Sequence, residues 1–131
     1  MIIIEDNFKT NLKYPTYIAL GSFDGLHLGH MHLINKILEL SKANNAKSMI
    51  CTFKNHPLSV INKEICPKLL MDNDTKINLL ENTGIDVVNL ADFNKDFMKI
   101  TPEEFIRNMV KCYNAKGIVV GFNYRFGYKN L

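Results

Sequence analysis

Residues 17–30, with the sequence YIALGSFDGLHLGH, join a short apolar run to the start of an amphipathic segment. The run at 17–20 is compact and ends at a glycine, which predicts a buried β-strand. From Leu28 onward, apolar side chains recur at helical spacing, at Met31, Ile34, Ile37 and Leu38. The stretch therefore predicts a strand, a glycine-rich loop and a helix in succession.

The rest of the chain repeats this alternation. Residues 48–53, 86–90 and 117–121 are further short apolar runs, and each predicts a strand. Asp74 can cap a helix that follows it, and Gly84 stands where a left-handed turn would end that helix.

Residues 101–113 carry the sharpest local helix signal. Thr101 can cap the helix, Pro102 suits its first position, and Glu104 lies three residues after the cap. One apolar face, interpreted as ordinary core, is expected from Phe105, Met109, Val110 and Tyr113.

Strands that alternate with helices require crossover connections and a parallel sheet. We therefore expect one α/β domain over residues 1–131, a Rossmann-like parallel sheet with helices on both faces. Such sheets bind ligands outside the carboxyl ends of their strands. The candidate binding segments are thus the three loops that follow residues 20, 53 and 120.

The composition is that of a globular domain and argues against several other classes of protein. Hydrophobic residues make up 47% of the 131 and charged ones 22%, which is typical of a globular domain. A net charge of +3 is too small to indicate a nucleic-acid groove, and the opening apolar run 1–4 is too short for a membrane span. Cys51, Cys66 and Cys112 form no C-x-x-C pair, which favours free thiols and a cytoplasmic protein.

The loop at 21–30 has the chemistry of an anion site. Its glycines allow a sharp turn and close approach of a ligand, and the following helix directs free N–H groups at it. His27 and His30 flank Gly29, so two imidazoles stand at the mouth of the site and suit a triphosphate. The spacing matches neither the dinucleotide fingerprint nor the phosphate-binding loop. Two alternatives stay open: a tight turn with helix-capping histidines, and a zinc site of His27, His30 and His32 without a second ligand pair.

Three segments resemble one family. The sequence GSFDGLHLGH at 21–30 is similar to the signature of nucleotidyltransferases with a His-x-Gly-His motif. Its Phe-Asp-Gly narrows the resemblance to the FAD synthetase (FMN adenylyltransferase) module of bacterial bifunctional riboflavin kinase/FAD synthetases. The segments TFKNHP at 52–57 and VVGFNYRFG at 119–127 resemble later motifs of that module, and TPEEF at 101–105 fits its helix start.

The resemblance implies adenylyl transfer from ATP to FMN, giving FAD and pyrophosphate. A phosphate oxygen of FMN would attack the α-phosphorus of ATP directly, with His27 and His30 stabilising the charge on the phosphoryl oxygens. Mg²⁺ is implied as the ion, held largely by phosphate oxygens and water. The implied ATP-binding residues are Gly21, Ser22, Phe23, Asp24, Gly25, His27, Gly29 and His30.

The flavin nucleotide is implied to lie against the second and third loops. Asn55 and Asn123 can each donate and accept a hydrogen bond, and Phe53 could form an apolar wall. Without the family, residues 55–57 are better interpreted as a turn, and Arg125 is as well interpreted as a surface residue. The implied flavin-binding residues are Phe53, Asn55, His56, Pro57, Asn123 and Arg125.

The sequence also departs from the family. Tyr124 stands where the family more often has Phe, and the family module continues past the last motif with a Ser/Thr-rich segment and an Arg. We therefore expect residues 1–131 to be an incomplete adenylyltransferase domain, with the riboflavin kinase domain absent. Two other functions remain: a non-catalytic flavin- or adenine-nucleotide-binding fragment, and a related nucleotidyltransferase with a different phosphate substrate.

Overall fold

Five parallel strands form a single sheet in the part of the chain that the structure describes. The computed structural model describes residues 1–21, 28–54 and 73–120, with only the backbone of 28–30 and 73. The strand order is β1-β4-β3-β2-β5, and every neighbouring pair is parallel. This confirms the predicted parallel α/β sheet. The strands are β1 (Ile2–Ile4), β2 (Thr16–Leu20), β3 (Lys47–Phe53), β4 (Val87–Ala91) and β5 (Ala115–Val120).

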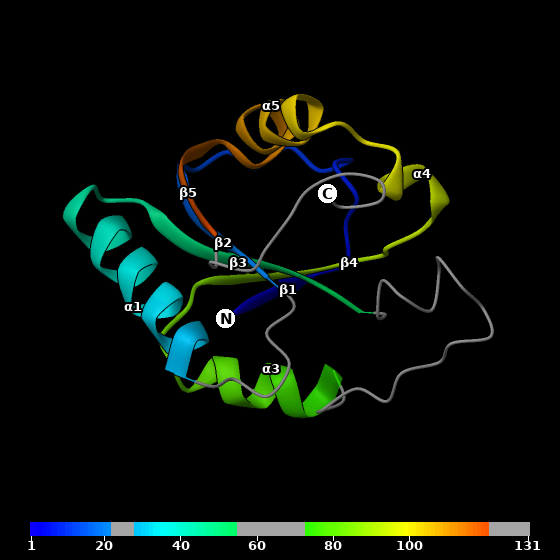
Figure 1. The fold of residues 1–131 in the computed structure, drawn as a ribbon. Coiled ribbons are helices and arrows are strands. Elements are labelled where there is room, and N and C mark those ends of the chain that lie inside the picture. Colours follow the sequence, from blue (N-terminus) through cyan, green and yellow to red (C-terminus); the bar gives the residue numbers. More distant parts are fainter. Residues whose placement is uncertain (22–27, 55–72, 121–131) are drawn as a thin grey trace.

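Helices cover both faces of this sheet (Figure 1). Two lie on one face and two on the other, so the described fold has three layers. The first pair is α1 (Leu28–Ala43) and α3 (Asn73–Glu81), and the second is α4 (Lys95–Met98) and α5 (Pro102–Tyr113).

Each face of the sheet has its own apolar core. Along β2, Ile18 and Leu20 belong to the core under α4 and α5, whereas Ala19 belongs to the core under α1 and α3. Ile34 and Ile37 of α1 are completely buried in the second core, as their helical spacing predicts. Burial on both faces is the reason that these strands read as continuous apolar runs.

Helix α5 begins as its sequence predicts. The Thr101 hydroxyl accepts a hydrogen bond from the Glu104 N–H at 3.2 Å, and Pro102 is the first helical residue. The predicted apolar face was wrong at one position, because Val110 is 53% exposed and Cys112 is buried in its place. A helix turns about 100° per residue, so Val110 points well away from the face that Phe105 and Cys112 share.

The opening residues form a strand, β1, that the spacing of apolar residues did not predict. β1 pairs with β4 at the edge of the sheet, where Ile2 and Ile3 remain about half exposed. Three β-branched residues suit an edge strand, but a run of three residues is too short to show the alternation of apolar and polar side chains that predicts a strand. The short helix α4 was likewise not predicted. Gly84 has a positive φ of 93°, as expected for a left-handed turn.

The lengths and hydropathies of the described helices show whether any of them could span a membrane. No helix within residues 1–21, 28–54 and 73–120 is both long enough and apolar enough to cross a membrane.

Candidate functional site

The carboxyl ends of β2, β3 and β5 lie side by side. Leu20 is in register with Cys51 of β3 on one side and with Val120 of β5 on the other. The chain passes from β2 to β3 and β4 in one direction and then returns to place β5 on the opposite side of β2. This reversal is the type of switch point at which open α/β sheets bind ligands. The three candidate loops therefore begin at neighbouring positions.

Helix α1 begins directly after the first of these loops. Its N-terminus follows the loop from β2 and carries no acidic residue in its first turn. The free N–H groups of that turn and the positive end of the helix dipole favour a bound anion, and no carboxylate there opposes one.

Few of the predicted site residues fall within the described residues. Gly21 does: it is buried, and its N–H donates to the Cys51 carbonyl oxygen at 3.3 Å. Phe53 is the last residue of β3, and Gly29 and His30 belong to the backbone of α1. Their assigned roles stay predictions. The remaining predicted residues lie outside the described ones: Ser22, Phe23, Asp24, Gly25, His27, Asn55, His56, Pro57, Asn123 and Arg125.

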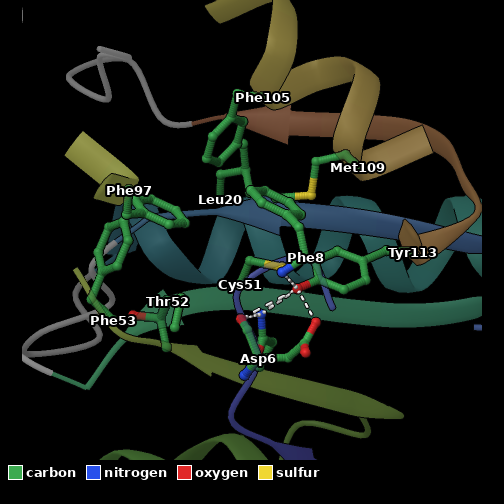
Figure 2. Close-up of a pocket in the computed structure, with 12 residues that line it drawn as sticks. Asp6, Phe8, Leu20, Cys51, Thr52, Phe53, Phe97, Phe105, Met109 and Tyr113 are labelled. Atoms are coloured by element: carbon green, nitrogen blue, oxygen red, sulfur yellow. Dashed lines mark hydrogen bonds between the residues drawn. The ribbon is translucent and has the colours of Figure 1, made fainter. Parts of the chain in front are cut away.

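A small hollow lies between the sheet and helices α4 and α5 (Figure 2). It extends beneath the carboxyl ends of β2, β3 and β4. Its unfilled volume is about 10 Å³, enough for roughly one water molecule. Its lining is Asp6, Phe8, Leu20, Cys51, Thr52, Phe53, Asn89, Ala91, Phe97, Phe105, Met109 and Tyr113.

Aromatic rings dominate one side of this hollow. Phe97 contacts the rings of Phe53 and Phe105 edge to face, with centroids 5.6 and 5.8 Å apart, and stacks parallel to Phe8 at 5.9 Å. These separations lie within the favourable range for aromatic pairs. Phe53 was predicted as a site residue, whereas Phe8 and Phe97 were missed and Phe105 was interpreted as core only. Phe105 is core, but it also lines the hollow.

A buried polar network forms the other side. The Tyr113 hydroxyl donates to Asp6 Oδ2 at 2.7 Å, and Asn89 Nδ2 donates to the Tyr113 hydroxyl at 3.2 Å. The Asp6 N–H donates to Asn89 Oδ1 at 2.9 Å. Asp6 also accepts from the backbone N–H groups of Lys9 and Thr10. The network fastens the N-terminal segment to β4 and α5.

The position of Asn89 within an apolar strand is a signal of this network in the sequence. It lies between Val87 and Ala91 on the strand face that packs under α5, so an amide occupies a core position. A buried amide requires partners, which predicts a polar group opposite it. The sequence does not say that this group is Asp6, 83 residues away.

Hydrogen bonding sets the charge of these groups. Burial by itself raises the pKa of Asp6, but hydrogen bonds from Tyr113, Thr10 and Lys9 outweigh it and hold the pKa below its usual value. Burial, together with the bond to Asp6, raises the pKa of Tyr113 far above the ordinary phenol value. Burial raises the pKa of the Cys51 thiol to about 12, so this thiol stays protonated and unreactive at neutral pH.

The Asp6 network predicts a loss of stability in acid. Because the native pKa of Asp6 is lowered, its contribution is complete above the unfolded value of about 3.9 and disappears as pH falls through the native pKa. Urea unfolding measured between about pH 2.5 and 6 should show this decline. It should be smaller in Asp6→Asn, and parallel curves for the two proteins would contradict the assignment.

Comparison with known proteins identifies similar chains. The profile of a family described as FAD synthetase matches residues 9–131. A bifunctional riboflavin kinase/FMN adenylyltransferase of Buchnera aphidicola is 34% identical over 113 residues, which cover 86% of this chain and 36% of that protein. A protein of Listeria monocytogenes named FAD synthetase is 32% identical over 111 residues, 84% of this chain and 45% of its own. The chain thus spans between a third and a half of the length of these relatives.

A solved structure also resembles the fold. It is the crystal structure of a protein from Streptococcus pneumoniae named as a macrolide-efflux protein, with a TM-score of 0.83 and 26% identity. The match covers 99% of this chain and 43% of that one. Because one fold serves many functions, this likeness supports the architecture and does not indicate efflux.

Proposed function

Because this chain belongs to the FAD synthetase family, we propose that it binds ATP and FMN and forms FAD and pyrophosphate. The observation that carries the proposal is the meeting of three strand ends, β3, β2 and β5, at the switch point of the sheet. The three motifs that resemble the family begin in the last two residues of these strands or directly after them. A direct transfer between two bound nucleotides needs such a site, where both ligands reach one edge of the sheet.

ATP is assigned to the loop between β2 and α1. The N-terminus of α1 would bind the phosphates, and His27 and His30 would donate hydrogen bonds to the phosphoryl oxygens as their charge rises. Within the described residues, no three His, Cys, Asp or Glu side chains come together as metal ligands. As the resemblance to the family implies, Mg²⁺ would be held mainly by the phosphate oxygens and water, and would neutralise their charge.

The flavin ring is assigned to the aromatic side of the hollow. Phe53, Phe97 and Phe105 offer ring faces and edges beneath the carboxyl ends of β2 and β3. A flat ring system gains from such walls through offset and edge-to-face contacts. Since the hollow now has room for about one water, ring binding requires these side chains to shift.

Bifunctional relatives carry a riboflavin kinase function in their names, and we assign no kinase activity to residues 1–131. The substrates are small molecules, and no nucleic acid or membrane takes part. The buried free thiols Cys51 and Cys112 suit the reducing cytoplasm, where we place the protein.

A chromatographic assay for FAD tests the proposal. The chain is incubated with FMN, ATP and Mg²⁺, and FAD is expected to form from FMN but not from riboflavin with ATP. FMN binding without FAD would instead indicate a nucleotide-binding fragment. Adenylylation of pantetheine phosphate, nicotinate mononucleotide or choline phosphate, with FMN left unchanged, would indicate a different substrate.

A further inference from the structure

Phe8 projects into the hollow from the segment that connects β1 to β2 (Figure 2). Its ring contacts Phe105 and Tyr113, with centroids 5.5 and 5.4 Å away, besides its stack on Phe97. It therefore lies between the aromatic side of the hollow and the buried polar network. The sequence around it carries none of the motifs that resemble the family.

The backbone of Phe8 is held on both sides. Its N–H donates to the Tyr113 hydroxyl at 3.1 Å, and its carbonyl oxygen accepts from Cys112 Sγ at 3.4 Å. The preceding Asn7 exchanges two hydrogen bonds with the backbone of Asp92, at 2.8 and 2.9 Å. These bonds join the segment both to the end of β4 and to the last turn of α5.

Phe8 also adopts a conformation that its residue type disfavours. Its φ is +63°, in the left-handed region where a side chain meets the backbone. Such a conformation persists where the surrounding contacts fix it, and it is enriched at sites that need a side chain held in place. Phe8 is thus a rigidly presented ring, whereas Phe97 stands on a helix of only four residues.

We infer that Phe8 is a positioning residue that forms the inner wall of the flavin ring pocket and limits how deeply the ring enters. The inference rests on the proposed function. When the ring enters from the strand ends and displaces Phe53 or Phe97, Phe8 stays in place and presents its face to the incoming edge. It also separates the flavin ring from the buried Asp6 carboxylate, which accepts hydrogen bonds from Tyr113, Lys9 and Thr10. The ring can then bind without disturbing these bonds.

Flavin binding to Phe8 variants tests this role. The fluorescence of FMN is titrated with wild type, Phe8→Leu and Phe8→Ala, and ATP binding is measured by calorimetry. Loss of the ring should raise the Kd for FMN about tenfold in Phe8→Ala, and less in Phe8→Leu, while the Kd for ATP stays unchanged. Phe8→Leu removes the ring but keeps an apolar side chain of intermediate size, so it provides the test if the alanine variant does not fold.

Phe93→Ala is the matched control. Its ring packs on Phe53 at 5.2 Å and on Phe97 at 5.8 Å, but it does not line the hollow. This variant loses a comparable aromatic contact and should keep its affinity for FMN within about twofold. Equal losses in Phe93→Ala and Phe8→Ala would overturn the inference, because they would reflect general loosening of the cluster.

The preference for FMN over a larger analogue distinguishes a Phe8 that limits the pocket from a Phe8 that only stabilises the fold. The apolar benzenoid edge of the flavin is the edge that suits an apolar wall such as Phe8. An FMN analogue with a phenyl-sized group on this edge should bind wild type more weakly than FMN does. In Phe8→Ala, where the wall is removed, its affinity should rise relative to that of FMN. A structural defect would weaken both ligands alike. Unchanged affinity and selectivity in both Phe8 variants would sink the inference alone, whereas a wild type that binds no FMN would sink the proposed function with it.

Discussion

Replacing His30 by alanine is expected to lower the rate of FAD formation by about 10²- to 10³-fold without unfolding the protein. His30 is the third residue of α1, in the turn that follows the loop from β2. A donor there would stabilise charge that develops on the phosphoryl oxygens only in the transition state, so its loss acts on kcat more than on binding. The chromatographic FAD assay measures the rate, and circular dichroism checks the fold.

His32→Ala is the control for this variant. His32 is exposed and lies on the same helix two residues further on, which turns its side chain to a different face. Its removal should leave the rate unchanged. A rate unaffected by His30→Ala, or an equal loss in both variants, would remove His30 from the mechanism.

Replacing Asp6 by alanine is expected to reduce the free energy of unfolding by about 2–4 kcal/mol. The carboxylate accepts hydrogen bonds from the Tyr113 hydroxyl at 2.7 Å and from Lys9 and Thr10. Without it, the buried Tyr113 hydroxyl loses its shorter acceptor and keeps the more distant Asp6 carbonyl oxygen, at 3.3 Å. The N-terminal segment then loses this side-chain link to α5, while the backbone bonds of Phe8 to Tyr113 and Cys112 remain. Chemical denaturation at neutral pH measures the difference.

Glu5→Ala provides the comparison at the neighbouring position. Its carboxylate pairs with Lys54 Nζ at 3.5 Å, but the Glu5 side chain is 61% exposed. Surface ion pairs contribute little, so a loss below about 0.5 kcal/mol is expected. If the two variants lose the same stability, the buried network does not hold the segment.

Much of the fold could be predicted from local signals. Apolar runs gave β2 to β5 within one or two residues, and the cap at Thr101 gave the start of α5. β1 and α4 were missed because runs of three and four residues show no period. Val110 was assigned to the wrong face because apolar character alone does not say which side of a helix is buried.

Some residues of the candidate site could be predicted from the sequence and others could not. The loops after β2, β3 and β5 could be selected from the sequence because parallel sheets bind ligands at carboxyl ends. Phe53 was selected with them and lines the hollow. Phe8 and Phe97 could not be selected, since they belong to no motif and reach the hollow through contacts with residues far along the chain.

The sequence by itself determined the alternation of β2 to β5 with α1, α3 and α5, the parallel sheet and the three loops at which chemistry is expected. These features depend on spacings of one to four residues, and such spacings are visible in the sequence itself. Only the tertiary structure decided that β5 returns beside β2 and that Phe8 lines the hollow. It also paired Asp6 with Asn89 and Tyr113, 83 and 107 residues away. Such pairings depend on packing and on the need of buried polar groups for partners, and neither leaves a local period in the sequence.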